Sequence, residues 1–210
     1  PVMPLIDVRS PAEYAHAHIP GAVNMPLLSD AERKQTGIAY KREGQEAAIK
    51  LGLDLVGVKL SRFVAEAKNI AMNNAVALHC WRGGMRSKSM AILFDFAGIR
   101  TYVIKGGYKS FRRLAKKYFD MPYSMLILGG NTGSGKTEVL HALQMAGEQV
   151  IDLEALAHHK GSAFGALGEE TQPTTEQFEN DLFYALRKCN LQKHIWLEDE
   201  SHLIGTVFIP

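Results

Sequence analysis

The sequence predicts an α/β protein made of two parallel-sheet domains, and three observations carry this prediction. Strand-like and helix-like segments alternate along the whole chain of 210 residues. Two of the apolar strand-like segments run directly into glycine-containing loops that are followed by helix-like segments. A break at residues 120–122, Asp-Met-Pro, separates a basic helix from a new apolar strand. We therefore expect one domain over residues 1–120 and a second over residues 121–210.

The individual elements follow from apolar runs and from the helical spacing of apolar residues. We expect strands over residues 5–8, 75–79, 101–104, 124–128, 149–151 and 194–197. We expect helices over residues 11–17, 57–73, 87–97, 108–118, 136–145 and 175–189. A further short strand should follow the Pro-Gly turn at residues 20–21.

Charge and cysteine content limit the function classes only weakly. The net charge of +2 is too small to indicate a nucleic-acid partner. Residues 100–117, however, contain seven basic residues and no acidic one. Such a run is usually a solvated helix face. The alternative is contact with RNA phosphates, for which the candidates are Lys109, Arg112, Arg113 and Lys116.

The rest of the composition favours a cytoplasmic protein that does not enter a membrane. No run of uncharged apolar residues approaches the length that a membrane span needs. The only two cysteines, Cys80 and Cys189, fall in different predicted domains. They suggest no disulfide framework, which fits a reducing compartment.

The first chemical motif is a cysteine loop, CWRGGMRS at residues 80–87. An apolar strand runs into Cys80, and a helix begins about seven residues later. Loop amides can then form an anion-binding nest, and the helix N-terminus adds partial positive charge. Arg82 and Arg86 supply full charges. All of these favour the thiolate, which is the nucleophile, so we expect Cys80, Arg82 and Arg86 to be catalytic.

Two alternatives remain open for this loop. A free cysteine is often simply buried and inert. The spacing between Cys80 and Arg86 is also that of cysteine-dependent phosphatases, in which the arginine clamps a phosphate.

The N-terminal segment indicates a family. The runs DVRSPAEY (residues 7–14) and HIPGAVN (18–24) resemble the rhodanese signature, and KGGY (105–108) resembles the turn that closes the rhodanese fold beside its active loop. Ser10, Pro11 and Glu13 also form a helix-start pattern with a capping box. Asp7 and Arg9, at a strand end, are expected to buttress the cysteine loop rather than to react.

The second motif is GGNTGSGKT at residues 129–137, which matches the phosphate-binding P-loop pattern from Gly130 onward. An apolar strand precedes it and a helix follows, as the motif requires. We expect a diphosphate to bind at Gly130, Gly133, Ser134, Gly135, Lys136 and Thr137. About 90 residues are few for a P-loop domain, so we expect this P-loop NTPase-like α/β domain to be incomplete.

Acidic residues suggest where a metal would lie. The Thr137 hydroxyl is a candidate Mg²⁺ ligand, and the strand that ends in Glu198 and Asp199 supplies candidate carboxylates. Alternation along a strand allows only one of these two neighbours to face the loop. The His158-His159-Lys160 cluster is either a substrate loop or ordinary polar surface, and we expect no zinc site there. Cys189 is expected to be a packing residue.

Together, these motifs resemble the family of bacterial tRNA 2-selenouridine synthases over nearly the whole chain. Besides the two loops, the shared motifs are HKGSAFG (residues 159–165) and WLEDES (196–201). The resemblance implies a rhodanese-like domain followed by a P-loop domain. It further implies a transferase that converts the wobble 2-thiouridine of tRNA to 2-selenouridine through S-geranyl-2-thiouridine.

The same resemblance implies the ligands and partners. Geranyl diphosphate would bind at the P-loop with Mg²⁺, and selenophosphate, provided by a separate supplying enzyme, would deliver selenium at Cys80. Two other functions stay open: a persulfide sulfurtransferase coupled to an ATP-binding domain, and a binding module without enzymatic activity.

Overall fold

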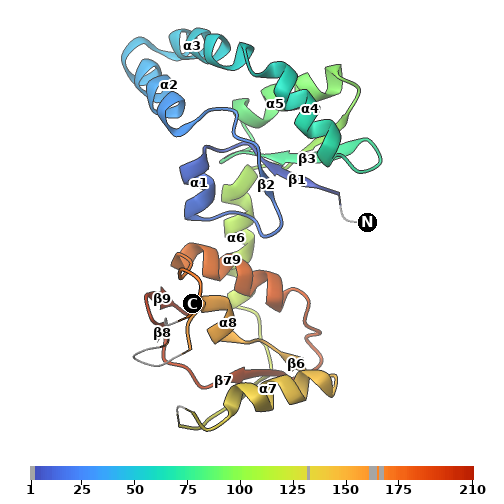
Figure 1. The fold of residues 1–210 in the computed structure, drawn as a ribbon, viewed down its shortest axis with the longest axis vertical. Coiled ribbons are helices and arrows are strands. Elements are labelled where there is room, and N and C mark those ends of the chain that lie inside the picture. The colour runs from blue at the N-terminus through green and yellow to red at the C-terminus, as the bar shows by residue number, and fades with distance from the viewer. Residues whose placement is uncertain (1–2, 132, 161–164, 166–167) are drawn as a thin grey trace. The chain divides into compact units, whose positions relative to one another are not determined.

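The computed structural model describes residues 3–131, 133–160, 165 and 168–210. The chain forms two compact units, residues 1–111 and 112–210. The division falls inside helix α6 (Gly107–Phe119), whose last residues come just before the boundary predicted after residue 120. Each unit is described by itself below (Figure 1).

The first unit is a parallel sheet with helices on both faces, as predicted. Within the described residues its strand order is β2-β1-β3-β4, and every neighbouring pair is parallel. The strands are β1 (Leu5–Asp7), β2 (Val23–Asn24), β3 (Ala75–His79) and β4 (Arg100–Val103). The central strand β3 is nearly continuous in apolar residues because it is covered on both faces. Its side chains pack with those of α4 (Leu60–Ile70) and α5 (Met85–Phe96), including Phe63 and Phe94.

Helix α1 (Pro11–His16) begins as the sequence predicts. Pro11 occupies the first helical position, and the Glu13 carboxylate accepts the backbone N–H of Ser10 at 3.2 Å. This contact satisfies an N–H group that the helix itself leaves without a partner.

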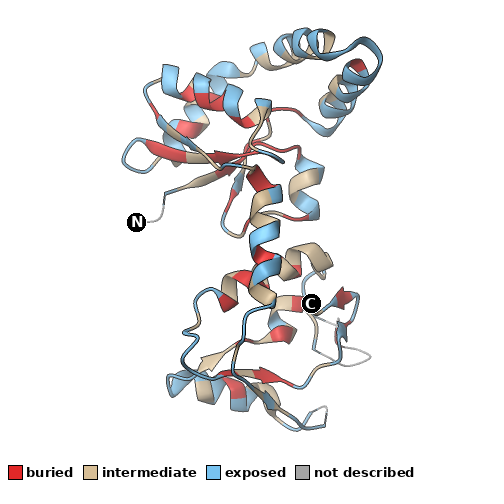
Figure 2. Ribbon diagram, turned by 180° about the vertical axis from the view of Figure 1, so that it is seen from behind, coloured by how far each residue is buried: buried red, intermediate tan, exposed pale blue. Residues whose placement is uncertain are grey.

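Two helices lie where the sequence patterns predict no element: α2 (Asp30–Glu43) and α3 (Gln45–Gly57). They form a hairpin that is separated by Gly44 at a φ of 96° and is largely exposed (Figure 2). Ala39 is the one buried residue of α2, and α3 has none. The apolar periodicity is therefore weak, although the Ser29–Glu32 capping box is a readable start signal. Residues 57–59, predicted to be helical with α4, instead belong to the end of α3 and the turn after it.

The second unit has a smaller parallel sheet with the strand order β5-β7-β6 in its described part. Its elements are β5 (Met125–Leu128), α7 (Lys136–Met145), β6 (Gln149–Val150), α8 (Leu153–Ala157), α9 (Thr175–Leu186) and β7 (Ile195–Glu198). A short antiparallel pair, β8 (Leu203–Ile204) and β9 (Val207–Phe208), follows. Phe178 and Leu182 of α9 pack with Ile195 and Leu197 of β7 to form the core. The short α8, β8 and β9 are not predicted by the sequence, because each is too brief for a periodic signal.

Candidate active site

Cys80 directly follows β3 and lies inside the loop that leads to α5. Its side chain is buried, with 3% of the residue exposed. Helix α5 begins at Met85 with Gly84 as its N-cap, two residues earlier than predicted. On the other side of the loop, the N–H groups of Tyr108 and Lys109 donate to the carbonyl oxygens of Cys80 and Trp81, each at 2.9 Å. The loop that carries the sulfur is therefore held between the first turn of α5 and the first turn of α6.

The loop makes this buried thiol more acidic than an ordinary one. Burial by itself raises the pKa of the Cys80 thiol. Hydrogen bonds from the Ser87 hydroxyl, 3.3 Å from Sγ, and from the backbone N–H groups of Ser87, Arg82 and Gly84 outweigh it, so that the pKa is lowered. Amides that converge on the sulfur stabilise its anion without any mobile charge. The arrangement suits a thiolate, or a sulfur or selenium atom bound to it.

The sequence predicts that the guanidinium groups of Arg82 and Arg86 stabilise the thiolate directly. In the structure, their surroundings differ from this expectation. Arg82 is exposed, and only its backbone N–H is among the groups that donate to the sulfur, which we call the amide cradle. The Arg86 guanidinium donates to the Glu13 carboxylate at 2.6 Å, and Glu13 also pairs with Arg33 at 3.0 Å. Hydrogen bonds, rather than these guanidinium groups, are the main causes of the lowered thiol pKa. Arg86 ties the first turn of α5 to α1 and α2.

Glycine is required where the two flanking turns meet. Gly107 has a φ of 57°, and a Cβ added there would lie 2.2 Å from the carbonyl oxygen of Cys80 and 2.5 Å from the amide nitrogen of Gly83. A side chain at residue 107 would therefore push the cysteine loop away from α6.

Asp7 and Arg9 form a buried support behind the loop. Arg9 Nε donates to Asp7 Oδ2 at 2.9 Å, and the guanidinium carbon lies 3.9 Å from the centre of the Tyr108 ring. Tyr108 is the residue whose N–H holds the carbonyl of Cys80. The pair thus connects the end of β1 to the cysteine loop through one aromatic ring, as expected of buttressing residues.

The P-loop leads from β5 into α7. Gly133 and Gly135 have φ values of 78° and 83°, which side chains other than that of glycine rarely adopt. The ammonium group of Lys136 donates to the carbonyl oxygen of Gly130 at 3.0 Å, so it lies across the loop. A Cβ on Gly130 would lie 2.7 Å from the Ser134 hydroxyl oxygen. Thr132 lies outside the described residues.

A cavity of about 590 Å³ lies against this loop. Its lining includes four of the predicted phosphate-binding residues, Gly133, Gly135, Lys136 and Thr137. Five carboxylates line it as well, those of Glu138, Asp152, Glu154, Glu169 and Glu200. Burial raises the pKa of both Glu154 and Glu200, and neighbouring carboxylates raise these pKa values further. The cavity therefore combines two lysines, Lys136 and Lys160, with a larger set of acidic oxygens.

The two carboxylates predicted to bind a metal, those of Glu198 and Asp199, have different surroundings in the structure. Glu198 is 2% exposed, and its Oε1 accepts the N–H of Glu154 at 2.9 Å at the start of α8. Asp199 is exposed, and its Oδ2 lies 3.9 Å from where a Cβ of Gly129 would be. Neither lines the cavity with Lys136 and Thr137, whereas Glu200 does. No group of three or more His, Cys, Asp or Glu side chains in the described part of the chain is arranged to hold a metal ion by itself.

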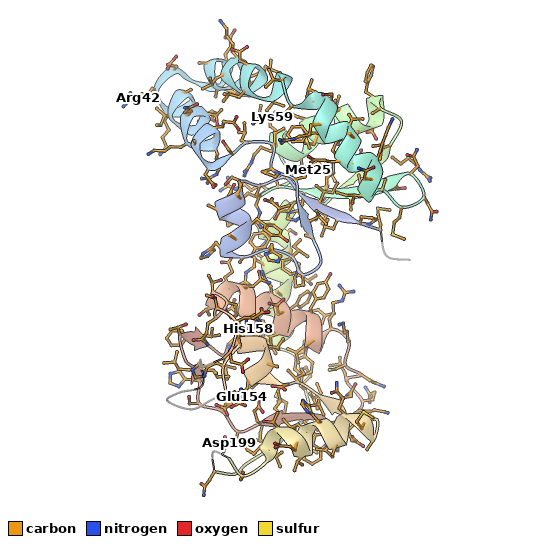
Figure 3. The ribbon with its side chains drawn as sticks, in the orientation of Figure 1. Met25, Arg42, Lys59, Glu154, His158 and Asp199 are labelled. Carbon is orange, nitrogen blue, oxygen red and sulfur yellow. The ribbon has the colours of Figure 1, made fainter. Side chains whose placement is uncertain are left out.

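Sequence reasoning missed the acidic wall of the cavity. Figure 3 labels Glu154 on α8 and Asp199 just after β7. The available signal was that Asp152, Glu154 and Glu200 all come shortly after strands β6 and β7, whose carboxyl ends share one edge of a parallel sheet.

The basic residues of α6 divide into two groups. Lys109, Arg113 and Lys116 are exposed. Arg112 instead donates to Asn180 Oδ1 at 2.6 Å and forms an ion pair with Glu179. Among the four residues predicted to contact RNA, Arg112 therefore has a structural role in the second unit.

The remaining candidates lie around α8 and α9. His158 ends α8 at a φ of 50°, and Lys160 pairs with Glu169 at 2.8 Å. His159 and Lys160 line the cavity beside the P-loop, whereas residues 161–164 of the predicted substrate loop lie outside the described residues. Burial raises the pKa of the Cys189 thiol, and its Sγ lies 3.5 Å from the carbonyl oxygen of Ala185. Cys189 thus has the surroundings of a packing residue.

Glu198 should make the protein less stable as the pH rises through about 7. Burial, with repulsion from Asp152, Glu154 and Glu200, raises its pKa from 4.5 to about 7 in the folded state. The unfolded chain binds this proton more weakly, so the stabilisation is complete below about pH 4.5 and is lost as the pH rises through about 7. We expect Glu198→Gln to be more stable than the wild type by about 1–3 kcal/mol near pH 8.

Urea unfolding of both proteins at about pH 5 and about pH 8 checks this. The other carboxylates affect the pH dependence of both proteins. Their contributions largely cancel when the unfolding free energy of the wild type is subtracted from that of the variant. An equal stability difference at the two pH values would contradict the assignment.

Comparisons with known proteins agree with this architecture. Residues 1–114 match the family described as "Rhodanese-like domain", and residues 123–210 match the family described as "tRNA 2-selenouridine synthase AAA domain". The chain belongs to the rhodanese-like family, and the predicted fold class, a rhodanese-like domain followed by a P-loop domain, is confirmed. Part of the chain is also 38% identical to a solved N-terminal domain of a candidate ATP/GTP binding protein from Clostridium difficile. That match has a TM-score of 0.51 and covers 53% of this chain and 88% of the other.

Several relatives that match nearly the whole chain are tRNA 2-selenouridine synthases. The chain is 42% identical to the synthase of Shewanella denitrificans, over 99% of this chain and 57% of that protein. It is 41% identical to the synthase of Nitrosomonas europaea, over 99% of this chain and 55% of that protein. The predicted resemblance to this family is confirmed, and the chain spans a little over half the length of these relatives. None of the described helices has the length and apolar character of a membrane-spanning helix.

Proposed function

We propose that this chain belongs to an enzyme that converts 2-thiouridine at the wobble position of tRNA to 2-selenouridine. The observation that carries the proposal is the Cys80 loop, where amides and a hydroxyl lower the pKa of a buried thiol at the end of a parallel strand. The similarity to tRNA 2-selenouridine synthases, which includes both this loop and the P-loop, supports the substrate.

The P-loop cavity is proposed to bind geranyl diphosphate. Amides of the loop and the Lys136 ammonium would neutralise the diphosphate. The sulfur of 2-thiouridine then forms a bond to the first carbon of the geranyl group while the bond from that carbon to oxygen breaks. Diphosphate leaves with the electron pair, and the N3 proton of the base passes to the diphosphate or to water. A preorganised positive charge at the leaving group lowers the barrier of such a step.

Mg²⁺ fits the donors that the cavity offers. Magnesium binds proteins through one or two carboxylates and takes its other ligands from water and substrate phosphates. We propose that the Thr137 hydroxyl and the Glu200 carboxylate, which both line the cavity, hold the Mg²⁺ ion. The Asp199 carboxylate lies beside Gly129, at the start of the P-loop. When bound, the ion would supply additional charge neutralisation at the diphosphate.

Cys80 is proposed to serve the exchange of sulfur for selenium. In the balanced reaction, S-geranyl-2-thiouridine, selenophosphate and water give 2-selenouridine, geranylthiol and phosphate. Cys80 would either carry the selenium or assist its attack at C2 of the base, and the amide cradle suits an anionic selenium atom as well as sulfur. A separate enzyme that makes selenophosphate is the implied partner, and the cytoplasm is the proposed compartment.

Mass spectrometry of tRNA nucleosides tests the proposal. Cells with the intact gene should contain 2-selenouridine, and cells without it should accumulate 2-thiouridine. Identical nucleoside profiles would refute the function. Thermal stabilisation by geranyl diphosphate but not by ATP would support the proposed ligand over the alternative of an ATP-coupled sulfurtransferase.

A further inference from the structure

The unpredicted helices α2 and α3 enclose a groove beside the cysteine loop. Its volume is about 560 Å³. Side chains from both helices line it, together with Met85 and Arg86 from the first turn of α5. That turn is also part of the cradle around Cys80, because Gly84 and Ser87 supply amides to its sulfur. The groove and the reactive loop thus share one structural element.

The groove is positively charged. Four cationic side chains line it, from Arg33, Lys34, Lys41 and Arg86, and no carboxylate is among its described lining residues. Glu13 already engages Arg33 and Arg86, and Glu32 of α2 is bound by Lys59 at 2.6 Å. Lys34 and Lys41 lie seven residues apart on α2, about two helical turns. Their charges are therefore available on the same face to an anion.

The same groove offers flat and apolar surfaces. Tyr40, at 58% exposed, is part of its wall, and the exposed side chains of Ile38 and Met85 lie in its lining. Exposed aromatic rings beside cations are the usual means of binding single-stranded nucleic acid, since bases stack on the ring while phosphates meet the cations. An acidic peptide would use the charges but would gain little from an exposed tyrosine ring.

We propose that the α2–α3 groove binds a single-stranded RNA segment, with phosphates at Lys34 and Lys41 and a base on Tyr40. This inference rests on the proposed function and assigns its RNA to a particular surface. A neighbouring nucleotide of the bound segment then reaches the loop that holds Cys80. Arg33 and Arg86 position the groove wall through Glu13 rather than serving as the main phosphate contacts.

Fluorescence anisotropy with a labelled RNA hairpin, carrying one 2-thiouridine in its single-stranded loop, tests the groove. The Lys34→Ala/Lys41→Ala variant should bind at least about tenfold more weakly at low salt, and the slope of log Kd against log salt should decrease by about one to two. Tyr40→Leu should weaken binding of the hairpin about fivefold or more while leaving the salt slope unchanged. A fully paired duplex should be insensitive to Tyr40→Leu.

The matched control removes two exposed lysines elsewhere, in the variant Lys68→Ala/Lys188→Ala. Equal weakening by the control and the groove variant would overturn the proposal, as would an absence of hairpin binding at low salt. Loss of binding only on replacing Lys109, Arg113 and Lys116 would place the RNA on α6 and also overturn it. An unchanged rate of Cys80 alkylation shows that each variant is folded.

The two proposals fail separately. Nucleosides without 2-selenouridine would refute the proposed function, whereas groove variants that bind RNA normally would refute only the groove.

Discussion

Replacing Cys80 with serine should abolish selenium incorporation, with a loss of at least about a thousandfold. The cradle of amides from Arg82, Gly84 and Ser87 lowers the pKa of a thiol, but a hydroxyl stays protonated in the same place. Geranylation should continue, because we propose that it takes place at the P-loop and not at Cys80. The measurement is the ratio of S-geranyl-2-thiouridine to 2-selenouridine in tRNA from cells that carry the variant gene.

Cys189→Ser is the matched control for this experiment. Burial raises the pKa of the Cys189 thiol, and no amide cradle surrounds it among the described residues. We expect normal 2-selenouridine in that variant. Normal selenium incorporation by Cys80→Ser would remove Cys80 from the reaction.

Replacing Lys136 with alanine should lower the rate of geranylation at least about a hundredfold. Lys136 is the cation that lies across the P-loop, where its ammonium group donates to the carbonyl oxygen of Gly130. Without it, the carboxylates of the cavity would outnumber its remaining lysine, Lys160, which already pairs with Glu169, and the site would repel a diphosphate. Both 2-selenouridine and S-geranyl-2-thiouridine should disappear, so that 2-thiouridine accumulates, in contrast to Cys80→Ser.

Lys193→Ala, which removes an exposed lysine of the same unit, is the control and should have no effect. Normal geranylation by Lys136→Ala would show that the P-loop does not bind the diphosphate. Direct binding of geranyl diphosphate, measured by calorimetry, separates a binding defect from a defect in the later step.

Much of the fold was predictable because its strands are short apolar runs that end in recognisable loops. Strand β3 and helix α7 have the predicted boundaries, and both loops lie where a strand meets a helix. The α2–α3 hairpin was not predictable in the same way, since a helix that buries almost no side chain has no apolar period to detect.

The chemistry of the sites was only partly predictable. The amides around Cys80 follow from the loop, but the pairing of Arg86 with Glu13 depends on residues 73 positions apart in the chain. The same limit applies to Arg112, whose partners Glu179 and Asn180 lie on another helix. It also applies to Glu198 and Asp199, because the strand pattern alone does not show which of the two side chains faces the P-loop. The hydrogen bond from the Glu154 N–H, at the start of α8, fixes the orientation of Glu198.

The position of Glu13 links two helices of the first unit, α2 and α5. One carboxylate holds Arg33 on α2 and Arg86 on α5 through short contacts, and its pKa, which burial alone would raise, is lowered by the Arg86 hydrogen bond, so it stays ionised at neutral pH. It cannot keep both ion pairs if these helices move apart. A displacement of α2 would therefore pull on the first turn of α5, where Gly84 and Ser87 supply two of the amides that acidify Cys80. We therefore expect the reactivity of the Cys80 thiol to change when the α2–α3 hairpin is displaced.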